Sequence, residues 1–99
     1  MVIVAGVVVL KPDTLETLRP DMLQMIAASR AEPGCRCYSY GIDVADQSVV
    51  RVYEEWESRA HLEAHVDTDH LKAWRRRLAE VGIVSRDITV WEATSPVPA

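Results

Sequence analysis

The chain has 99 residues, of which 48% are hydrophobic and 26% are charged. This length suffices for one hydrophobic core and is too short for two, and the composition excludes a disordered or collagen-like chain. The net charge of -4 argues against a general nucleic-acid or anionic-membrane binder, because both need clustered positive charge. We therefore expect a single domain over residues 1–94 and a flexible tail over residues 95–99.

The first half of the chain predicts a strand, a helix and a second strand. Residues 2–10 form a β-branched run, which is typical of a strand covered on both faces. A helical spacing of apolar residues follows Pro12, and Pro20 inside it predicts a kink or a break. Glu32-Pro33-Gly34 ends the helix, and residues 35–43 read as the second strand.

The second half predicts a hairpin, a helix broken in two and a last strand. A short polar stretch leads into a strand over residues 49–56. Ser58 predicts the cap of a short helix, and Asp67 or Thr68 the cap of the next one, which ends at Gly82. Residues 88–93 predict the last strand.

This order of elements indicates an α+β fold of the ferredoxin-like βαββαβ type, with a four-stranded antiparallel sheet and helices on one face. One chain would leave the opposite face of the sheet bare, although apolar residues lie on it. Sheet-to-sheet contact between two copies would cover that face. We therefore expect a homodimer.

The location of the protein is suggested by the cysteines and the N-terminal segment. Cys35 and Cys37 are the only cysteines, and their i,i+2 spacing on a strand does not suit a disulfide. A reducing, cytoplasmic compartment is the simplest interpretation. The apolar residues 1–10 are about half the length needed to span a bilayer and lack a basic leader, so we expect neither a signal peptide nor an anchor.

Several short motifs follow one another in a recognisable order. They are Glu32-Pro33-Gly34-Cys35 with Tyr38 three residues on, Val52-Tyr53-Glu54-Glu55-Trp56, Ala60-His61-Leu62, and Ala64-His65 with His70 five residues later. This pattern resembles the antibiotic biosynthesis monooxygenase family, which includes quinol monooxygenases, over essentially the whole chain. The resemblance implies a dimeric α+β barrel with a pocket between sheet and helices. It also implies that members of the quinol-oxidising kind use no metal or flavin.

The sequence is consistent with chemistry that needs no cofactor. Its four glycines lie too far apart for a dinucleotide or phosphate loop. A protein without a redox cofactor must draw electrons for dioxygen from the substrate, and an electron-rich hydroquinone can supply them. The function that we predict is a cofactor-independent monooxygenase of quinols or related polyphenols, with dioxygen and a small aromatic substrate as its partners.

Three side chains are predicted to be catalytic. A helix turns His65 toward the core, it matches the family's recurrent histidine, and its titration near neutrality suits a base that takes a phenolic proton. His70 matches the second histidine of the motif, where a packing role is equally compatible with the sequence. Glu54 shares a strand face with apolar neighbours, so its pKa should be raised unless a cation such as Arg51 or Arg86 meets it.

Three aromatic side chains are candidate substrate contacts: Trp56, Trp74 and Tyr53. Each could stack on an aromatic ring, and each could equally belong to the core. His61 and His65 are spaced to clamp a metal ion, but no third ligand follows in the sequence and we predict no metal.

Two other functions fit the same residues. The first is a dimeric binding protein for a small metabolite, without redox turnover. The second is a non-redox isomerase of a small carbonyl metabolite, a reaction that resembles that of another branch of the family. The chain contains no asparagine, which argues against the haem-degrading branch.

Overall fold

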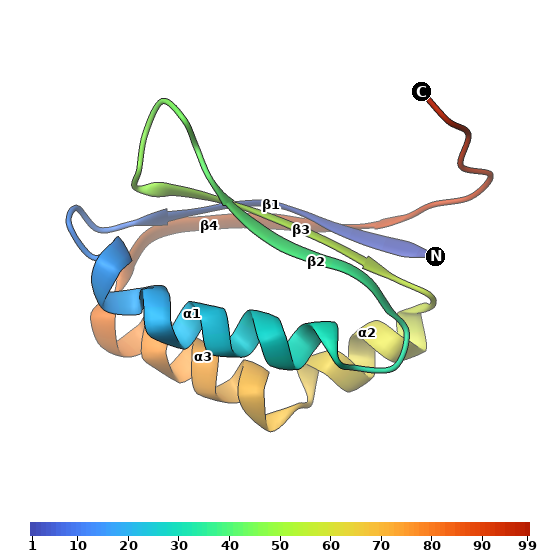
Figure 1. Cartoon of the computed structure of the whole chain (residues 1–99), viewed down its shortest axis with the longest axis horizontal. Helices are drawn as coiled ribbons and strands as arrows, with labels where there is room; N and C mark the ends of the chain where they lie inside the picture. Colours follow the sequence, from blue (N-terminus) through green and yellow to red (C-terminus); the bar gives the residue numbers. More distant parts are fainter.

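A computed structural model describes residues 1–99. The elements in chain order are β1 (Val2–Leu10), α1 (Leu15–Arg30), β2 (Cys35–Ile42), β3 (Val49–Trp56), α2 (Arg59–Val66), α3 (Asp69–Val81) and β4 (Ile83–Glu92). The strands form one antiparallel sheet in the order β2-β3-β1-β4, and the helices cover one of its faces (Figure 1). This confirms the predicted ferredoxin-like βαββαβ fold. No helix combines the length and the apolar character that a membrane-spanning segment needs.

The core lies between the sheet and the helices. Alternate residues of the central strand β1, among them Val4 and Val8, point toward the helices, and the core contains 15 buried hydrophobic residues. Leu18 of α1 and Trp56 of β3 are completely buried. Removing a large apolar side chain from water contributes about 1.5–3 kcal/mol, so this layer holds the helices on the sheet.

Helix α1 runs through Pro20 without the break that the sequence suggested. Pro20 lies on the exposed side of the helix, while Leu18 and Met22 face the core. The carbonyl left without a partner by the proline ring can therefore be hydrated, and the buried side continues unbroken.

Strand β4 begins at Ile83, five residues before the predicted start at Ile88. Residues 84–87 are exposed and mostly polar, so they lack the alternation by which the rest of the strand was recognised. Their pairing with β1, which includes a register shift between Val9 and Leu10, extends the strand nonetheless. Backbone pairing with a long central strand overrides weak local propensity here.

The predicted caps of the two short helices are confirmed. The Ser58 side chain accepts a hydrogen bond from the His61 amide, and the Thr68 side chain accepts one from the Leu71 amide. Gly82 ends α3 with a φ of 84°, which favours glycine. Because α3 begins only three residues after α2 ends, the end of α2 and the first turn of α3 adjoin on the helix side of the sheet (Figure 1).

The other face of the sheet has no helix over it (Figure 1). Ile3 of β1 pairs with Trp91 of β4, and Ala5 pairs with Tyr53 of β3, so apolar side chains of three strands meet on this face. The Trp91 side chain is 60% exposed. A single chain therefore leaves a contiguous apolar band open to water.

Candidate active site

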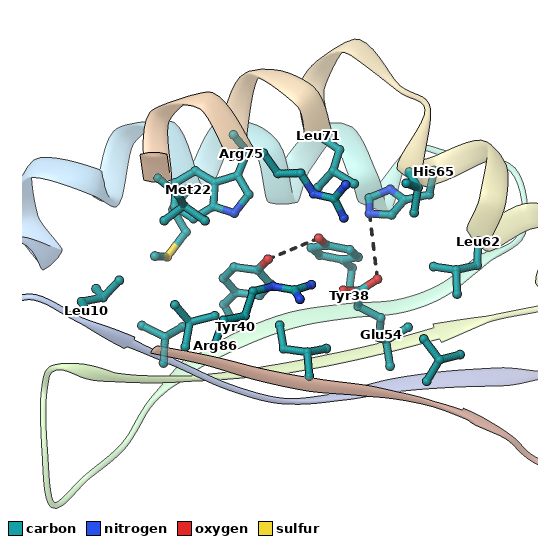
Figure 2. Close-up of a pocket in the computed structure, with 18 residues that line it drawn as sticks. Leu10, Met22, Tyr38, Tyr40, Glu54, Leu62, His65, Leu71, Arg75 and Arg86 are labelled. Carbon is teal, nitrogen blue, oxygen red and sulfur yellow. Dashed lines mark hydrogen bonds and ion pairs between the residues drawn. The ribbon is translucent and has the colours of Figure 1, made fainter. Parts of the chain in front are cut away.

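A cavity of about 300 Å³ lies between the helices and the sheet (Figure 2). Its wall is formed by 18 residues, of which 14 are hydrophobic, including Tyr38, Tyr40 and Trp74. The remaining four are Glu54, His65, Arg75 and Arg86. An apolar chamber with a few converging polar groups is the usual form of a site for a small organic molecule.

His65, at the end of α2, is 2% exposed and lies in the wall of this cavity. Its Nδ1 atom lies 2.6 Å from Oε2 of Glu32, and its Nε2 atom lies 3.9 Å from Oε1 of Glu54. The ring packs on Trp56 with 4.6 Å between centroids and meets Tyr38 edge-on at 5.3 Å. These contacts fix which nitrogen faces the carboxylate of Glu32 and which faces Glu54.

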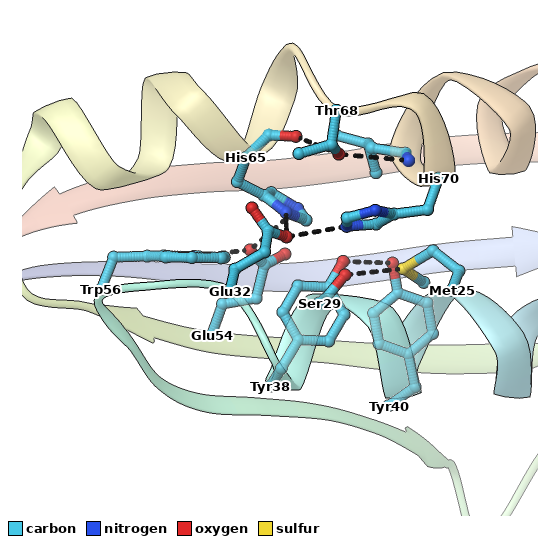
Figure 3. Close-up of polar contacts among 11 residues, drawn as sticks. Met25, Ser29, Glu32, Tyr38, Tyr40, Glu54, Trp56, His65, Thr68 and His70 are labelled. Atoms are coloured by element: carbon cyan, nitrogen blue, oxygen red, sulfur yellow. Dashed lines mark hydrogen bonds and ion pairs between the residues drawn. The ribbon is translucent and has the colours of Figure 1, made fainter.

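Glu32 is held by the turn that joins α1 to β2. Pro33 and Gly34 occupy the two central positions, the φ of Gly34 is 78°, and the Cys35 amide donates to the Glu32 carbonyl, as in a type II turn. The Glu32 side chain is 11% exposed and points to the histidines. Its Oε2 atom also lies 2.8 Å from Nε2 of His70, so one carboxylate joins both imidazoles (Figure 3).

Burial favours the neutral form of His65. Desolvation lowers the pKa of the imidazole below its usual value and outweighs the opposing effect of the Glu32 carboxylate. A neutral ring beside that carboxylate carries its proton on Nδ1, and this N–H donates a hydrogen bond to Glu32. Its Nε2 lone pair is then directed toward Glu54 and is available to accept a proton.

Glu54 lies on the helix-facing side of β3 and is 6% exposed, as the strand parity predicted. Burial raises its pKa to about 7, while a hydrogen bond from Nε1 of Trp56, 2.9 Å long, acts in the opposite direction. Arg51 takes no part, because it pairs with Asp43 at 2.8 Å. Glu54 can therefore release or take up a proton near neutrality.

Tyr38 and Tyr40 lie side by side on β2 and face the cavity (Figure 2). Their hydroxyl oxygens are 3.4 Å apart, and burial raises the pKa of both phenols. Both groups thus stay protonated, and they offer the cavity hydrogen-bond donors that do not titrate.

The structure brings together only some of the predicted residues. His65, Glu54 and Trp74 line the cavity, whereas His70 does not line it and is linked to His65 through Glu32. Trp56 does not line it: the side chain is completely buried behind His65 and holds Glu54.

Tyr53 lies on the opposite face of the sheet, where its hydroxyl donates to Glu55 at 2.8 Å. The predictions of substrate contact in this cavity therefore do not fit Trp56 or Tyr53. The alternation of side chains along β3 already separated Tyr53 from Glu54.

Glu32 was missed as a member of the site. Its motif, Glu32-Pro33-Gly34, indicates a helix end and contributes to the family resemblance, but neither interpretation assigns a role to the Glu32 carboxylate. The contacts of Glu32 with His65 and His70 span 33 and 38 residues, so no local pattern indicates them.

The same three side chains are the one set that could hold a metal ion. The nearest ligand atoms of Glu32, His65 and His70 all lie within 4.8 Å of one another, and two imidazoles with one carboxylate suit a divalent transition metal. To bind it, Glu32 would have to give up hydrogen bonds to both rings. The pair whose spacing was considered and set aside, His61 with His65, does not form, because Nδ1 of His61 lies 2.7 Å from the Ser58 hydroxyl.

The fold and the site together define a small α+β domain with an apolar cavity beside an oriented imidazole. A family model described as "Antibiotic biosynthesis monooxygenase" matches residues 1–77. The chain belongs to this family.

Named relatives and solved structures show the same likeness. "Putative monooxygenase Rv0793" of Mycobacterium tuberculosis is 31% identical over 80 residues, which cover 81% of this chain and 76% of that protein. Its solved structure superposes with a TM-score of 0.86 at 26% identity, covering 98% of both chains. A solved structure from Deinococcus radiodurans reaches a TM-score of 0.92 at 21% identity, covering 100% of this chain and 98% of the other, which shows the shared fold.

"Probable quinol monooxygenase YgiN" of Escherichia coli is 42% identical over 52 residues, covering 43% of this chain and 49% of that protein. A Synechocystis protein, "Uncharacterized protein sll1783", is 35% identical over 69 residues, covering 70% of this chain and 47% of that protein. The chain thus spans about half the length of these two relatives.

Proposed function

We propose that the protein is a cofactor-independent monooxygenase that oxidises quinols or related polyphenols with dioxygen. The observation that carries this proposal is the neutral, oriented imidazole of His65 in the wall of a cavity that also contains Tyr40 and Trp74. Membership of the family and the printed name of the Escherichia coli relative support it.

The reaction begins when Nε2 of His65 takes a proton from a phenolic hydroxyl. The resulting anion transfers one electron to dioxygen, which gives a semiquinone radical and superoxide. These combine at a ring carbon to form a peroxide, and the imidazolium returns its proton to that peroxide. Loss of water converts the carbon to a carbonyl, so one quinol and one dioxygen yield one hydroxyquinone and one water.

The surrounding residues have distinct roles in this scheme. Glu32 holds the His65 tautomer and stabilises the imidazolium, as a buried carboxylate does beside a catalytic histidine. Glu54 can relay a proton from Nε2. Trp74 and Tyr40 form the aromatic walls.

We expect the protein to consume dioxygen with 1,4-naphthalenediol after treatment with a strong chelator and without added metal, flavin or nicotinamide. An oxygen electrode measures the rate above that of the diol alone, and mass spectrometry identifies the product and its oxygen isotope. Ligand-dependent thermal stabilisation without oxygen uptake would indicate a binding protein instead. Turnover of a carbonyl substrate under nitrogen would indicate an isomerase, and loss of oxygen uptake on chelation, restored by a metal, would assign Glu32, His65 and His70 to a metal site.

We further propose that a second copy of the chain covers the open face of the sheet. The apolar band that includes Ile3 and Trp91, and the small size of the domain, support this assembly. Trp91→Glu should convert the dimer to a monomer in analytical ultracentrifugation. Val44→Glu, in an exposed loop, is the matched control and should stay dimeric. A monomeric unmodified chain would contradict the proposal.

The free thiols of Cys35 and Cys37 support a reducing compartment, and we propose the cytoplasm.

A further inference from the structure

Two arginines at the cavity have no protein partner. Arginines 19, 36, 51, 59 and 77 each pair with a carboxylate, and Arg30 donates to a backbone carbonyl. Arg75 of α3 and Arg86 of β4 make neither a salt bridge nor a side-chain hydrogen bond, yet both line the cavity. Figure 2 shows both guanidinium groups extending into the space between α3 and the sheet.

The charges of Arg75 and Arg86 oppose the rise in the pKa of Glu54, but neither arginine bonds directly to a neighbouring carboxylate. Glu54, the carboxyl group that shares the cavity wall with them, accepts its hydrogen bond from Trp56. Glu32 is occupied by His65 and His70. Each guanidinium therefore keeps its planar set of N–H donors free, and such a fork matches the two oxygens of a carboxylate.

The polar groups of the cavity differ in depth. His65 and Glu54 are buried, whereas Arg75 and Arg86 are exposed and belong to a helix and to an edge strand. The cations thus lie at the solvent side and the base at the inner side, and Arg75 is near enough for its charge to lower the pKa of His65. A molecule that fits both ends has an acidic group at one end and a reactive hydroxyl at the other.

We propose that the cavity takes aromatic substrates that carry a carboxylate, with Arg75 and Arg86 as the residues that bind it. The part of this inference that concerns the reacting hydroxyl rests on the proposed function, because it requires His65 to act as the base. A cavity of about 300 Å³ limits the occupant to a small ring system. A monoanion suits it better than a dianion, since the carboxyl group of Glu54 lines the same cavity.

The test compares 2-naphthoate with 2-naphthamide, which have nearly the same shape and differ in charge. Neither carries a phenolic hydroxyl, so binding is measured by calorimetry without turnover. We expect naphthoate to bind the unmodified protein about tenfold more tightly than the amide. Arg75→Gln and Arg86→Gln should each weaken naphthoate binding about tenfold and leave naphthamide binding unchanged.

Arg76→Gln is the matched control, because Arg76 is an exposed arginine of the same helix that does not line the cavity. Naphthoate affinity should be unchanged in this variant. Equal affinities for the two ligands, an equal loss in Arg76→Gln, or no binding of naphthoate would each overturn the proposal. Unchanged naphthamide binding shows that the Arg75 and Arg86 variants are folded.

The binding test does not depend on whether the protein oxidises quinols. The protein could bind naphthoate through Arg75 and Arg86 and yet consume no dioxygen with any quinol. This result would support the carboxylate-binding site and refute the proposed monooxygenase activity. Oxygen uptake with neutral quinols, together with equal binding of naphthoate and naphthamide, would refute only the carboxylate-binding role of Arg75 and Arg86. A quinol with its carboxylate on the other ring, such as 5,8-dihydroxy-2-naphthoate, should then be no better a substrate than 1,4-naphthalenediol.

Discussion

Replacing His65 with glutamine is expected to lower kcat/KM for quinol oxidation about 100-fold, at the low end of what a positioned general base contributes. The amide of glutamine can fill part of the space between Glu32 and Glu54 but cannot accept a phenolic proton. The measurement is the initial rate of oxygen uptake with 1,4-naphthalenediol. Equal rates for His65→Gln and the unmodified protein would remove His65 from the mechanism.

His61→Gln is the matched control for this substitution. His61 lies on the same helix, is half-buried and contacts the Ser58 hydroxyl, outside the cavity. Its replacement should leave kcat/KM within about twofold of the unmodified value. A comparable loss in both variants would indicate that any disturbance of α2 inactivates the protein, and would not identify a base.

Glu32→Gln separates positioning from proton transfer. An uncharged amide can face Nδ1 of His65 through either its oxygen or its nitrogen, so it no longer fixes the tautomer, and it removes the negative charge that raises the pKa of His65. We expect a smaller loss of kcat/KM, about tenfold. The acid limb of the pH–rate profile should shift to lower pH, because the imidazole then loses its proton more easily. A loss of rate without this shift would indicate a purely structural role for Glu32.

Much of the framework of the site follows from local sequence signals. The two-residue period of β3 directs Glu54 to the helix side, and Ser58 and Thr68 mark the helix starts from which the orientation of His65 follows. Each of these inferences depends on neighbours within a few residues. That is why the order of the helices and strands and the burial of Glu54 could be predicted.

The contacts that complete the site are long-range and could not be predicted in this way. Glu32 reaches His65 across 33 residues through a turn whose local signal indicates only a change of direction. Arg86 was considered as a partner for Glu54, but its place on β4 depends on the pairing of an exposed, polar segment with β1. Trp56 is an aromatic residue of the kind that often lines a pocket. Only the packing of His65 against it shows that it supports the base.

Glu54→Gln is expected to gain stability relative to the unmodified chain as pH rises toward neutrality. The pKa of Glu54 is about 7 in the folded chain against 4.5 for a free side chain, so the folded state retains a proton that the unfolded state releases between these values. The free energy of unfolding contributed by this group therefore falls as pH rises from about 4.5 to about 7, by about 3 kcal/mol in total. The substitution removes this loss.

His65 contributes the opposite slope, so the profile of the unmodified protein alone does not isolate Glu54. Its lowered pKa means that the unfolded state binds a proton first as pH falls below about 6.5, and stability from this group is lost toward acid. The informative quantity is the difference in unfolding free energy between Glu54→Gln and the unmodified chain, from urea denaturation at fixed protein concentration.

That difference should change by about 3 kcal/mol in favour of the variant between pH 4.5 and pH 8. Glu63→Gln, at an exposed position of α2, is the charge-matched control, and its difference should vary by less than about 0.5 kcal/mol. A flat difference for Glu54→Gln would mean that this carboxyl group is hydrated in solution. Glu54 would then be ionised throughout the neutral range and could not donate a proton to Nε2 of His65, so the proton returned to the peroxide would have to come from the imidazolium itself.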